Sequence, residues 1–341
     1  MKNITIDKSV YISNRKKLTK ELKPGSMAVV VSNDTMPTNS DGTMKFKQNS
    51  DMLWLTGVGQ EESILIMFPD SPDKNFKEVL FLRETSELIA IWEGKKLSKD
   101  EAREKTGVEN IMWLSEFDRV FRLLITDAEN VYINSNEHKR AVIEVETRAA
   151  RFIKKWKEQY PLHEYQRLAP IINRLRMYKS KQEIEMMQHA CDLTEKGFRR
   201  VLKFTKPGVT EYEIEAEFAH EFIRNGGGFA DYSPIIASGK SACVLHYIEN
   251  DKVCNDGDVL LIDTGAAVNN YNADMTRAIP VNGRFTKRQK KVYNAVLNVM
   301  KFTTSQVVKG GIWKDIQKAT EECMERELVN LKLLKMSDIK K

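Results

Sequence analysis

The sequence predicts a two-domain protein, with an α/β domain in its first half and an α+β domain in its second half. Its 341 residues exceed the length of one ordinary domain. Short apolar runs bounded by turn residues dominate the first half, whereas capped helices flank a hairpin pattern in the second. We expect domains at residues 1–165 and 166–341, because the charged and aromatic segment 151–166 is typical of a link between domains.

Composition favours a soluble protein of the cytoplasm. A hydrophobic fraction of 41% is enough for two cores, and a charged fraction of 30% is ordinary for a soluble chain. The net charge of +6 is spread without a basic stripe, so we expect no nucleic-acid partner. No signal sequence or membrane-length apolar run is visible, so we expect no membrane partner. The four cysteines lack CxxC spacing, which is typical of free thiols in a reducing compartment.

The first half predicts a helix over residues 13–22, followed by a meander of strands. The capping box Ser98-x-x-Glu101 predicts a further helix that Gly107 ends. The expected strands lie at residues 27–34, 52–58, 63–69, 78–84, 88–94, 111–114 and 130–135. Three residues near strand ends have packing explanations at least as good as functional ones: Asp51, Arg83 and Trp92.

Helices are expected on both sides of the hairpin in the second half. Capping boxes open three of them, at Ser180, Thr210 and Thr286, and a fourth follows Gly310-Gly311. The first of these helices ends before the breaker Lys206-Pro207-Gly208 and should bury an apolar face made of Ile184, Met187, Ala190, Cys191 and Leu193.

The stretch VLLIDTGAAVNNYNADMTR, residues 259–277, predicts a β-hairpin. If its turn is centred between Val268 and Asn269, Asp263 lies opposite Asp274, with both side chains on one face and about 5 Å apart at Cβ. A turn centred one residue later, on the two asparagines, shifts the pairing by two and makes the aspartates diagonal neighbours.

Two carboxylates at that separation repel each other unless a positive charge lies between them. Asp263 and Asp274 therefore indicate a site for divalent cations. A hairpin with two solvated aspartates is the alternative, and the spacing alone leaves the two interpretations about even.

Two stretches resemble the pita-bread metallopeptidases, which include aminopeptidase P, prolidase and methionyl aminopeptidase. IDTGA followed by NADMTR is similar to their metal-binding hairpin, and FADYSPIIASGKSACVLHYIEND, residues 229–251, is similar to the segment that carries their active-site histidine. His246 lies 17 residues before Asp263, as in that pattern. The first half resembles the N-terminal, creatinase-like domain of aminopeptidase P and prolidase, which methionyl aminopeptidase lacks.

The resemblance implies a Xaa-Pro aminopeptidase or a Xaa-Pro dipeptidase that acts on peptides with proline at the second position. Asp263 would chelate one of two metal ions and Asp274 would bridge both. Manganese suits such an oxygen-rich site, with cobalt, zinc or iron as alternatives. His246 would steady the substrate or the tetrahedral intermediate. A homodimer is expected by the same resemblance.

The resemblance also implies five metal ligands: two aspartates, one histidine and two glutamates. No HGxxHxxG-like stretch follows Asp274, so we expect this chain to lack three ligands and part of the pita-bread domain. The carboxylates that do follow are typical of a solvated helix surface: Glu321, Glu322, Glu325 and Glu327.

Two explanations for the missing ligands stay open. The chain is either a truncated peptidase or a non-catalytic peptide-binding or dimerising module on the same fold. Apolar faces should be exposed in both cases. A metal-free creatinase-like hydrolase is a weaker alternative, because such a site has no need of the aspartate pair.

Overall fold

The computed structural model describes residues 6–135, 137 and 144–339. The chain divides into two compact units, the first ending at Glu185 and the second beginning at Met186. The domain boundary expected between residues 165 and 166 stays a prediction. None of the helices in the described part of the chain combines the length and apolar character needed to cross a bilayer.

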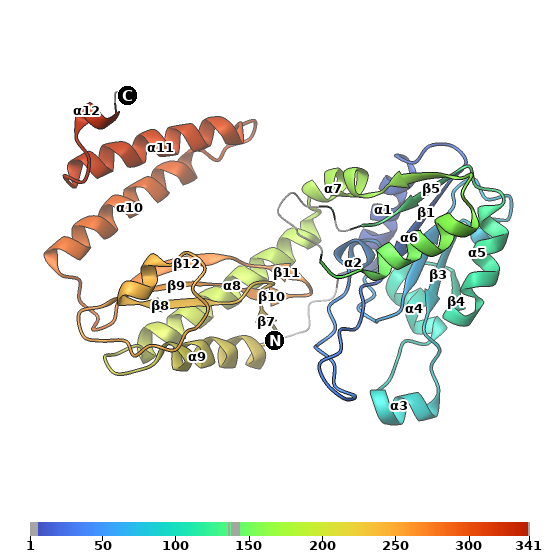
Figure 1. The fold of residues 1–341 in the computed structure, drawn as a ribbon, viewed down its shortest axis with the longest axis horizontal. Helices are drawn as coiled ribbons and strands as arrows, with labels where there is room; N and C mark the ends of the chain where they lie inside the picture. The colour runs from blue at the N-terminus through green and yellow to red at the C-terminus, as the bar shows by residue number, and fades with distance from the viewer. Residues whose placement is uncertain (1–5, 136, 138–143, 340–341) are drawn as a thin grey trace. The chain divides into compact units, whose positions relative to one another are not determined.

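The N-terminal unit is built on a six-stranded sheet with the order β4-β3-β2-β1-β5-β6 (Figure 1). Strands β1, β2 and β3 are antiparallel neighbours, whereas β4, β5 and β6 each join the sheet in parallel. The strands are β1 (Ser26–Val31), β2 (Ile64–Met67), β3 (Glu78–Leu82), β4 (Asn110–Trp113), β5 (Asn130–Ile133) and β6 (Glu164–Arg167).

Helices cover both faces of this sheet, because alternate residues of the central strand β1 point to opposite sides. Val29 belongs to one core with Phe121 and Trp156, while Val30 belongs to the other core with Met52. The helices are α1 (Lys8–Thr19), α2 (Ser50–Thr56), α3 (Glu87–Glu93), α4 (Lys99–Thr106), α5 (Phe117–Ile125), α6 (Arg148–Gln159) and α7 (Ala169–Met177), with short 3₁₀ turns η1 (Lys74–Phe76) and η2 (Leu114–Glu116).

Two of the expected strands are wrong, because helix caps decide these segments. Residues 52–58 lie mostly in α2, whose N-cap Asn49 accepts hydrogen bonds from two backbone amides and whose C-cap is the left-handed Gly57. Residues 88–94 lie mostly in α3, capped by Ser86. The first helix also begins earlier than expected, because Asp7 caps α1. The other five strand segments and the capping box that opens α4 are confirmed.

The C-terminal unit packs two helices against two small sheets, with strand orders β11-β10-β7 and β12-β9-β8 (Figure 1). Apolar side chains of both helices, including Leu193 and Phe218, share one core with Ile236 and Leu260. Its elements are α8 (Lys181–Phe204), α9 (Glu211–Arg224), β7 (Gly228–Phe229), β8 (Ile235–Ser238), the 3₁₀ turn η3 (Gly239–Cys243), β9 (Val259–Thr264), β10 (Ala266–Val268), β11 (Tyr271–Asn272), β12 (Met275–Pro280), α10 (Lys287–Gln306), α11 (Trp313–Asn330) and α12 (Met336–Ile339).

The buried face of α8 differs from the expected one. Ala190 and Leu193 are buried as expected. Ile184, Met187 and Cys191 are exposed instead, and Met186 is buried. The buried stripe continues through Phe198, so it follows helical spacing but is rotated relative to the predicted face.

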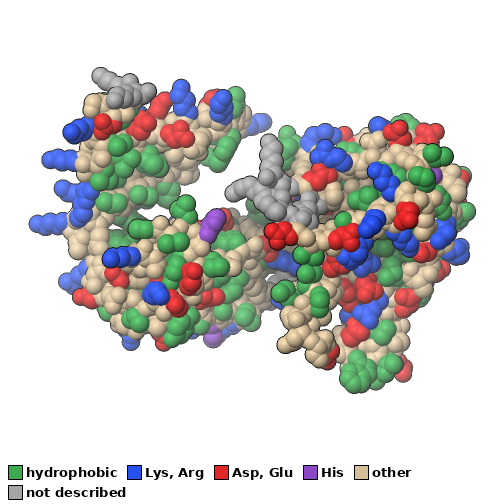
Figure 2. All heavy atoms as spheres, viewed as in Figure 1, with side chains coloured by type: hydrophobic (Ala, Val, Ile, Leu, Met, Phe, Trp, Pro, Cys, Tyr) green, Lys and Arg blue, Asp and Glu red, His purple; other side chains and the backbone are tan. Residues whose placement is uncertain are grey.

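Exposed apolar side chains gather on the helical pair α10–α11 (Figure 2). They include Val296 and Met300 of α10, Val308 of the segment between the helices and Trp313 of α11, each between 46% and 71% exposed. The exposed apolar surface expected from the sequence is therefore present on these helices.

Candidate metal centre

The predicted hairpin is present, and its turn lies on Asn269 and Asn270. Both residues have positive φ, 50° and 64°, which is the conformation of a two-residue type I′ turn. Thr276 therefore pairs with Asp263 in the ladder between β9 and β12. The direct pairing of Asp263 with Asp274 is wrong, and the alternative shifted by two residues is confirmed. Asp274 is two residues from Thr276, so it lies diagonally from Asp263 on the same face.

The two aspartates interact electrostatically although they are not paired. Burial raises the pKa of Asp263, and the negative charge of Asp274 raises it further. Oδ1 of Asp263 is buried and has no hydrogen-bond partner within the described residues. Asp274 is exposed, so the pair opens toward solvent from its side.

Tyr232 is a third member of this group, and sequence analysis did not single it out. It lies in the loop before β8, and its hydroxyl is 3.4 Å from Oδ1 of Asp274. Burial raises the pKa of Tyr232, and the charges of Asp274 and Asp263 raise it further, so the hydroxyl stays protonated and can donate. The only sequence signal for it was its place between Phe229 and Ile235, in the segment with the family resemblance.

This donor set fits a divalent cation. A buried carboxylate oxygen without a donor, next to a second carboxylate, is a repulsive arrangement that a cation would relieve. Hard oxygen ligands suit magnesium- or manganese-like ions. No group of three or more His, Cys, Asp or Glu side chains suited to a metal is found in the part of the chain that the structure describes. Asp263 and Asp274 are thus the two carboxylates of this group that could hold such an ion.

His246 lies on an exposed turn between η3 and β9. Within residues 6–135, 137 and 144–339, no hydrogen bond or ion pair joins it to Asp263 or Asp274. The structure therefore brings the two aspartates together but does not show a direct contact with the histidine.

The glutamates near the end of the chain have the surroundings expected of a helix surface. Glu321 accepts a hydrogen bond from Gln317 on the same helix, α11. Glu327 accepts one from Asn298 of α10.

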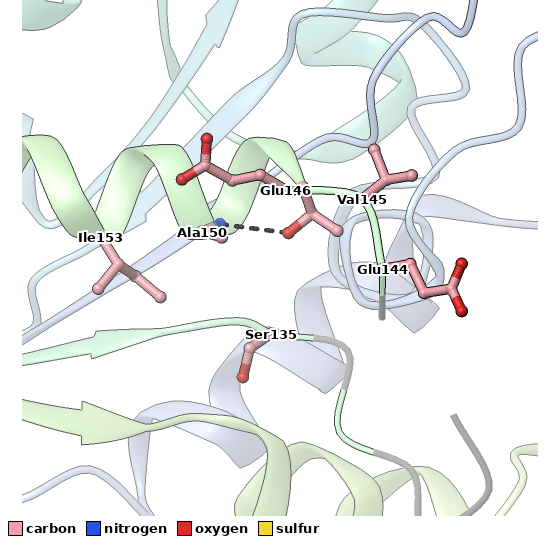
Figure 3. A pocket seen from close by; sticks show the side chains of 7 residues that line it. Ser135, Glu144, Val145, Glu146, Ala150 and Ile153 are labelled. Atoms are coloured by element: carbon pink, nitrogen blue, oxygen red, sulfur yellow. Dashed lines mark hydrogen bonds between the residues drawn. The ribbon is translucent and has the colours of Figure 1, made fainter. Parts of the chain in front are cut away.

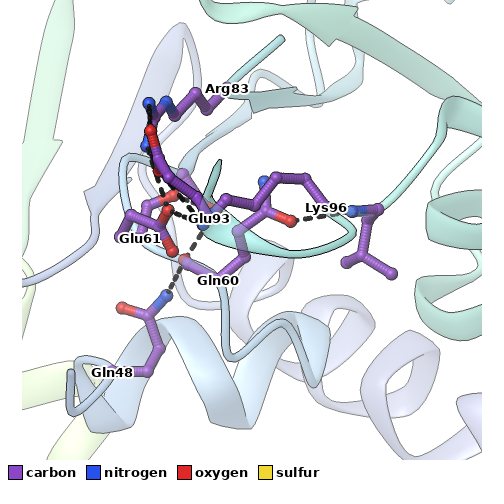
Figure 4. Close-up of polar contacts among 8 residues, drawn as sticks. Gln48, Gln60, Glu61, Arg83, Glu93 and Lys96 are labelled. Atoms are coloured by element: carbon purple, nitrogen blue, oxygen red, sulfur yellow. Dashed lines mark hydrogen bonds and ion pairs between the residues drawn. The ribbon is translucent and has the colours of Figure 1, made fainter. Parts of the chain in front are cut away.

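The polar residues flagged in the N-terminal unit are engaged in structural contacts. Asp51 pairs with Arg176 at 2.7 Å. Arg83 makes two hydrogen bonds to Glu93, of 2.6 and 2.7 Å, in a network that Glu61, Lys96, Gln60 and Gln48 extend (Figure 4). These contacts occupy Arg83 and Asp51 and favour the packing explanation for both.

A pocket of about 390 Å³ lies beside the start of α6 in the N-terminal unit (Figure 3). Its lining includes Ser135, Glu144 and Thr147, and Thr147 caps α6 by accepting from the Ala150 amide at 3.2 Å. None of the predicted site residues lines it.

Two protein-family models match the chain. One, described as metallopeptidase family M24, matches residues 185–336. The other, described as aminopeptidase P, N-terminal domain, matches residues 11–132. The order of the two matches is the order of domains expected from the sequence.

Similar proteins cover nearly the whole chain. It is 30% identical to the Xaa-Pro aminopeptidase of Escherichia coli over 97% of its own length and 75% of that protein. The Pseudomonas aeruginosa aminopeptidase PepP has a TM-score of 0.88 and 30% identity, over 97% of this chain and 75% of that one. Two Escherichia coli aminopeptidase P structures, one with substrate and one zinc-substituted with product, each have a TM-score of 0.84 and 29% identity. Each match covers 97% of this chain and 76% of the other.

These likenesses confirm the predicted fold class. The N-terminal unit is the α/β domain of aminopeptidase P, and the C-terminal unit is a pita-bread domain shorter than that of the similar proteins.

Proposed function

The chain belongs to the Xaa-Pro aminopeptidase family of metallopeptidases, and we propose that it recognises peptides with proline at the second position. The proposed reaction is hydrolysis of the bond between the N-terminal residue and that proline. The observation that supports it is the acidic pair, in which the half-buried Asp263 has a buried, unpartnered Oδ1 beside Asp274. Four free cysteines agree with our proposal that the protein works in a reducing cytoplasm.

Asp263 and Asp274 would hold the metal, and manganese suits their oxygen donors. Cobalt, zinc and iron are alternatives, and one similar structure is of a zinc-substituted enzyme. When bound, the metal supplies Lewis-acid polarisation of the scissile carbonyl.

The protein's own side chains have separate proposed roles. The protonated Tyr232 hydroxyl donates to Asp274 and holds that carboxylate in one orientation. His246 donates a hydrogen bond from a ring N–H to the oxyanion that forms from the substrate carbonyl. The bond before proline has no N–H, so a pocket shaped for the ring would supply the specificity.

Two carboxylates alone hold a divalent ion weakly, because water must supply the remaining ligands. The family resemblance implies one histidine and two glutamates in addition. We therefore propose that the chain as given binds metal weakly and turns over substrate only when further ligands complete the site.

Metal binding can be measured directly by titrating the purified chain with manganese in a calorimeter. We expect one weak site. We expect Asp263→Asn and Asp274→Asn each to lower the manganese affinity at least tenfold, because loss of a residue that only supports a ligand already costs about 10-fold or more. Asp256→Asn is the matched control, because this exposed aspartate of the same unit bonds only to Asn282 among the described contacts. If the wild type and the three variants bind manganese with equal affinity, Asp263 and Asp274 are not its ligands.

Turnover is measured separately, as manganese-dependent release of the first residue from a Xaa-Pro peptide. We expect none from the chain as given, and measurable release would overturn our view that the site is incomplete.

A non-catalytic peptide-binding or dimerising module is the second candidate, favoured by the apolar side chains exposed on α10–α11. Under that alternative, a Xaa-Pro peptide binds with equal affinity with and without manganese. Our first proposal expects the peptide to bind more tightly when manganese is present.

A further inference from the structure

The segment between η3 and β9 carries His246 and is held by two buried side chains that follow the histidine in the sequence. Tyr247 is 6% exposed and Asn250 is 3% exposed, whereas Leu245 is 90% exposed and His246 also faces solvent. The segment has no helix or strand of its own between Val244 and Lys252. Its position therefore depends on these buried anchors.

Glu211 is the partner of the first anchor. It is the first residue of α9 and is fully buried. Its carboxylate accepts three hydrogen bonds, from the Ser238 amide at 2.6 Å, the Tyr247 hydroxyl at 2.7 Å and the Lys252 amide at 3.0 Å. These donors, with the positive end of the helix dipole, compensate a buried negative charge.

The Tyr247 hydroxyl can donate its hydrogen bond to Glu211 over a wide pH range. Burial, and then the hydrogen bond to Glu211, raise the pKa of Tyr247 to about 12. The hydroxyl is therefore protonated at neutral pH. Because an ionised carboxylate only accepts, the hydroxyl is the donor in this bond.

Asn250 ties the same segment to β8 and again to α9. Its side-chain oxygen accepts from the Ile236 amide, and its Nδ2 donates to the Pro234 carbonyl, both at 3.0 Å. The side-chain amide of Asn250 thus bonds to the backbone of β8 along its free edge. A neighbouring strand would satisfy these backbone groups with its own peptide groups. Nδ2 also donates to Glu215 at 2.8 Å, one turn after Glu211 on α9.

The other edge of β8 pairs with the strand that carries the acidic pair. Ile235 is the ladder partner of Asp263. Strand β8 is therefore connected on one edge to the candidate metal centre and on the other to the segment that carries His246.

We infer that Glu211 is a positioning residue for His246: through Tyr247 and Lys252 it fixes the histidine-bearing segment relative to the sheet that carries Asp263. This inference rests on the role proposed for His246. It also accounts for a fully buried carboxylate outside the candidate metal centre. The glutamate acts on the histidine through two hydrogen bonds and has no chemical step of its own.

The test follows the imidazole signals of His246 by NMR in the full chain labelled at histidine, assigned with His246→Gln. Glu211→Gln removes one acceptor oxygen. Tyr247→Phe removes the hydroxyl, and with it the bond to Glu211 and a longer contact of 3.3 Å to Asp251, while leaving the amides of Ser238 and Lys252 bonded. We expect both variants to shift and broaden the His246 signals, and Glu211→Gln to speed hydrogen exchange of the Lys252 amide at least tenfold.

Glu217→Gln is the matched control, because this glutamate of α9 pairs with Arg200 and not with the segment. Signals of His163 and His220 report whether each unit is folded. Unchanged His246 signals in a folded Tyr247→Phe or Glu211→Gln protein would overturn the inference, even if stability falls, because a purely structural role predicts that result.

Manganese provides a readout that separates the two proposals. In the wild type we expect the paramagnetic ion to broaden the His246 signals, and in Tyr247→Phe we expect that effect to fall at least twofold at equal metal occupancy. If manganese does not bind at all, the metal site of the proposed function fails, while the metal-free signals and the exchange rates still decide the role of Glu211.

Discussion

Gly265 lies so close to Ala273 that a Cβ atom added to the glycine would be 1.9 Å from the Ala273 carbonyl oxygen. Thr264 is the last residue of β9 and Ala266 is the first of β10, so the hairpin passes from one small sheet to the other at this glycine. The Gly265 carbonyl also accepts from the Ala230 amide at 2.8 Å. The close contact between Gly265 and Ala273 therefore fixes how near the two chain segments lie to each other beside Asp263 and Asp274.

We predict that Gly265→Ala separates the strands and disturbs the acidic pair. A contact of this kind with a backbone atom cannot be relieved by a side-chain rotation, so we expect a loss of about 1–3 kcal/mol in the free energy of unfolding. Manganese affinity should fall with it. Denaturant unfolding and calorimetric titration measure the two effects. Gly228→Ala is the control, because a Cβ there meets no atom within 4 Å, and equal behaviour of the two variants would refute the steric argument.

The raised pKa of Asp263 predicts how stability depends on pH without metal. Between the ordinary value of 3.8 and the raised value, the folded state binds more protons than the unfolded state, so stability falls as pH rises through that window. Asp263→Asn removes this effect. In a chelator at pH 7 we expect the variant to melt roughly 2–4 °C above the wild type, the shift that about 1 kcal/mol produces in a domain of this size.

The same comparison should change sign when metal is present. Manganese stabilises the folded wild type by binding to it, whereas the Asn variant lacks a ligand and gains less. Below pH 3.8 the difference between the proteins should vanish, because the carboxyl is then protonated in both states. Melting curves that keep one order under all three conditions would show that burial and the charge of Asp274 do not destabilise the ionised Asp263.

Local signals in the sequence predicted those elements whose ends are fixed by side chains close in the chain. The capping box of Ser98 and the strands β2 and β3 follow from residues within a few positions of one another. The apolar residues of α2 and α3 predict strands, whereas the caps Asn49 and Ser86 make these segments helical. The periodicity of a short apolar run does not distinguish a helix from a strand, so the residues that cap its ends decide the assignment.

The candidate centre was predictable only in part for a related reason. Asp263 and Asp274 are joined by a hairpin, so a local turn brings them together. Tyr232 and Glu211 reach their partners through tertiary contacts, across 42 residues to Asp274 and 36 residues to Tyr247. No spacing rule in the sequence specifies such contacts.

We predict that Arg15 is a major source of stability in the N-terminal unit. Its side chain is 1% exposed, and Nη1 donates to the carbonyls of Leu55 at 2.8 Å and Thr106 at 3.0 Å. These carbonyls lie in the last turns of α2 and α4, where a cation is favourable. Nε also donates to Glu78 at 2.9 Å.

Arg15→Met should therefore cost about 2–6 kcal/mol, because two buried carbonyls would lose their donor at about 1–3 kcal/mol each. Denaturant unfolding followed by fluorescence measures it. Arg174→Met is the control, because that arginine is exposed and pairs with Glu21 on the surface, where such pairs contribute about 1 kcal/mol or less. Similar losses in both variants would mean that the carbonyl contacts of Arg15 contribute little.

We propose that the protein forms a homodimer, and α3 offers a surface for self-association. Leu88, Ile91 and Trp92 are 65%, 79% and 81% exposed, and their spacing places them on one face of this short helix. Apolar side chains gather over α3 in the space-filling view (Figure 2). Exposed clusters of this kind are typical of interaction sites.

Sedimentation velocity over a concentration series tests this surface. We expect the wild type to dimerise and the pair Leu88→Lys with Trp92→Lys to weaken the dimer at least tenfold, because two charges would enter an apolar contact. Leu162→Lys is the control, since Leu162 is 97% exposed outside this face. A second variant, Val296→Lys with Trp313→Lys, changes α10–α11. If only the second variant dissociates the dimer, the contact lies on α10–α11 and α3 has no part in it.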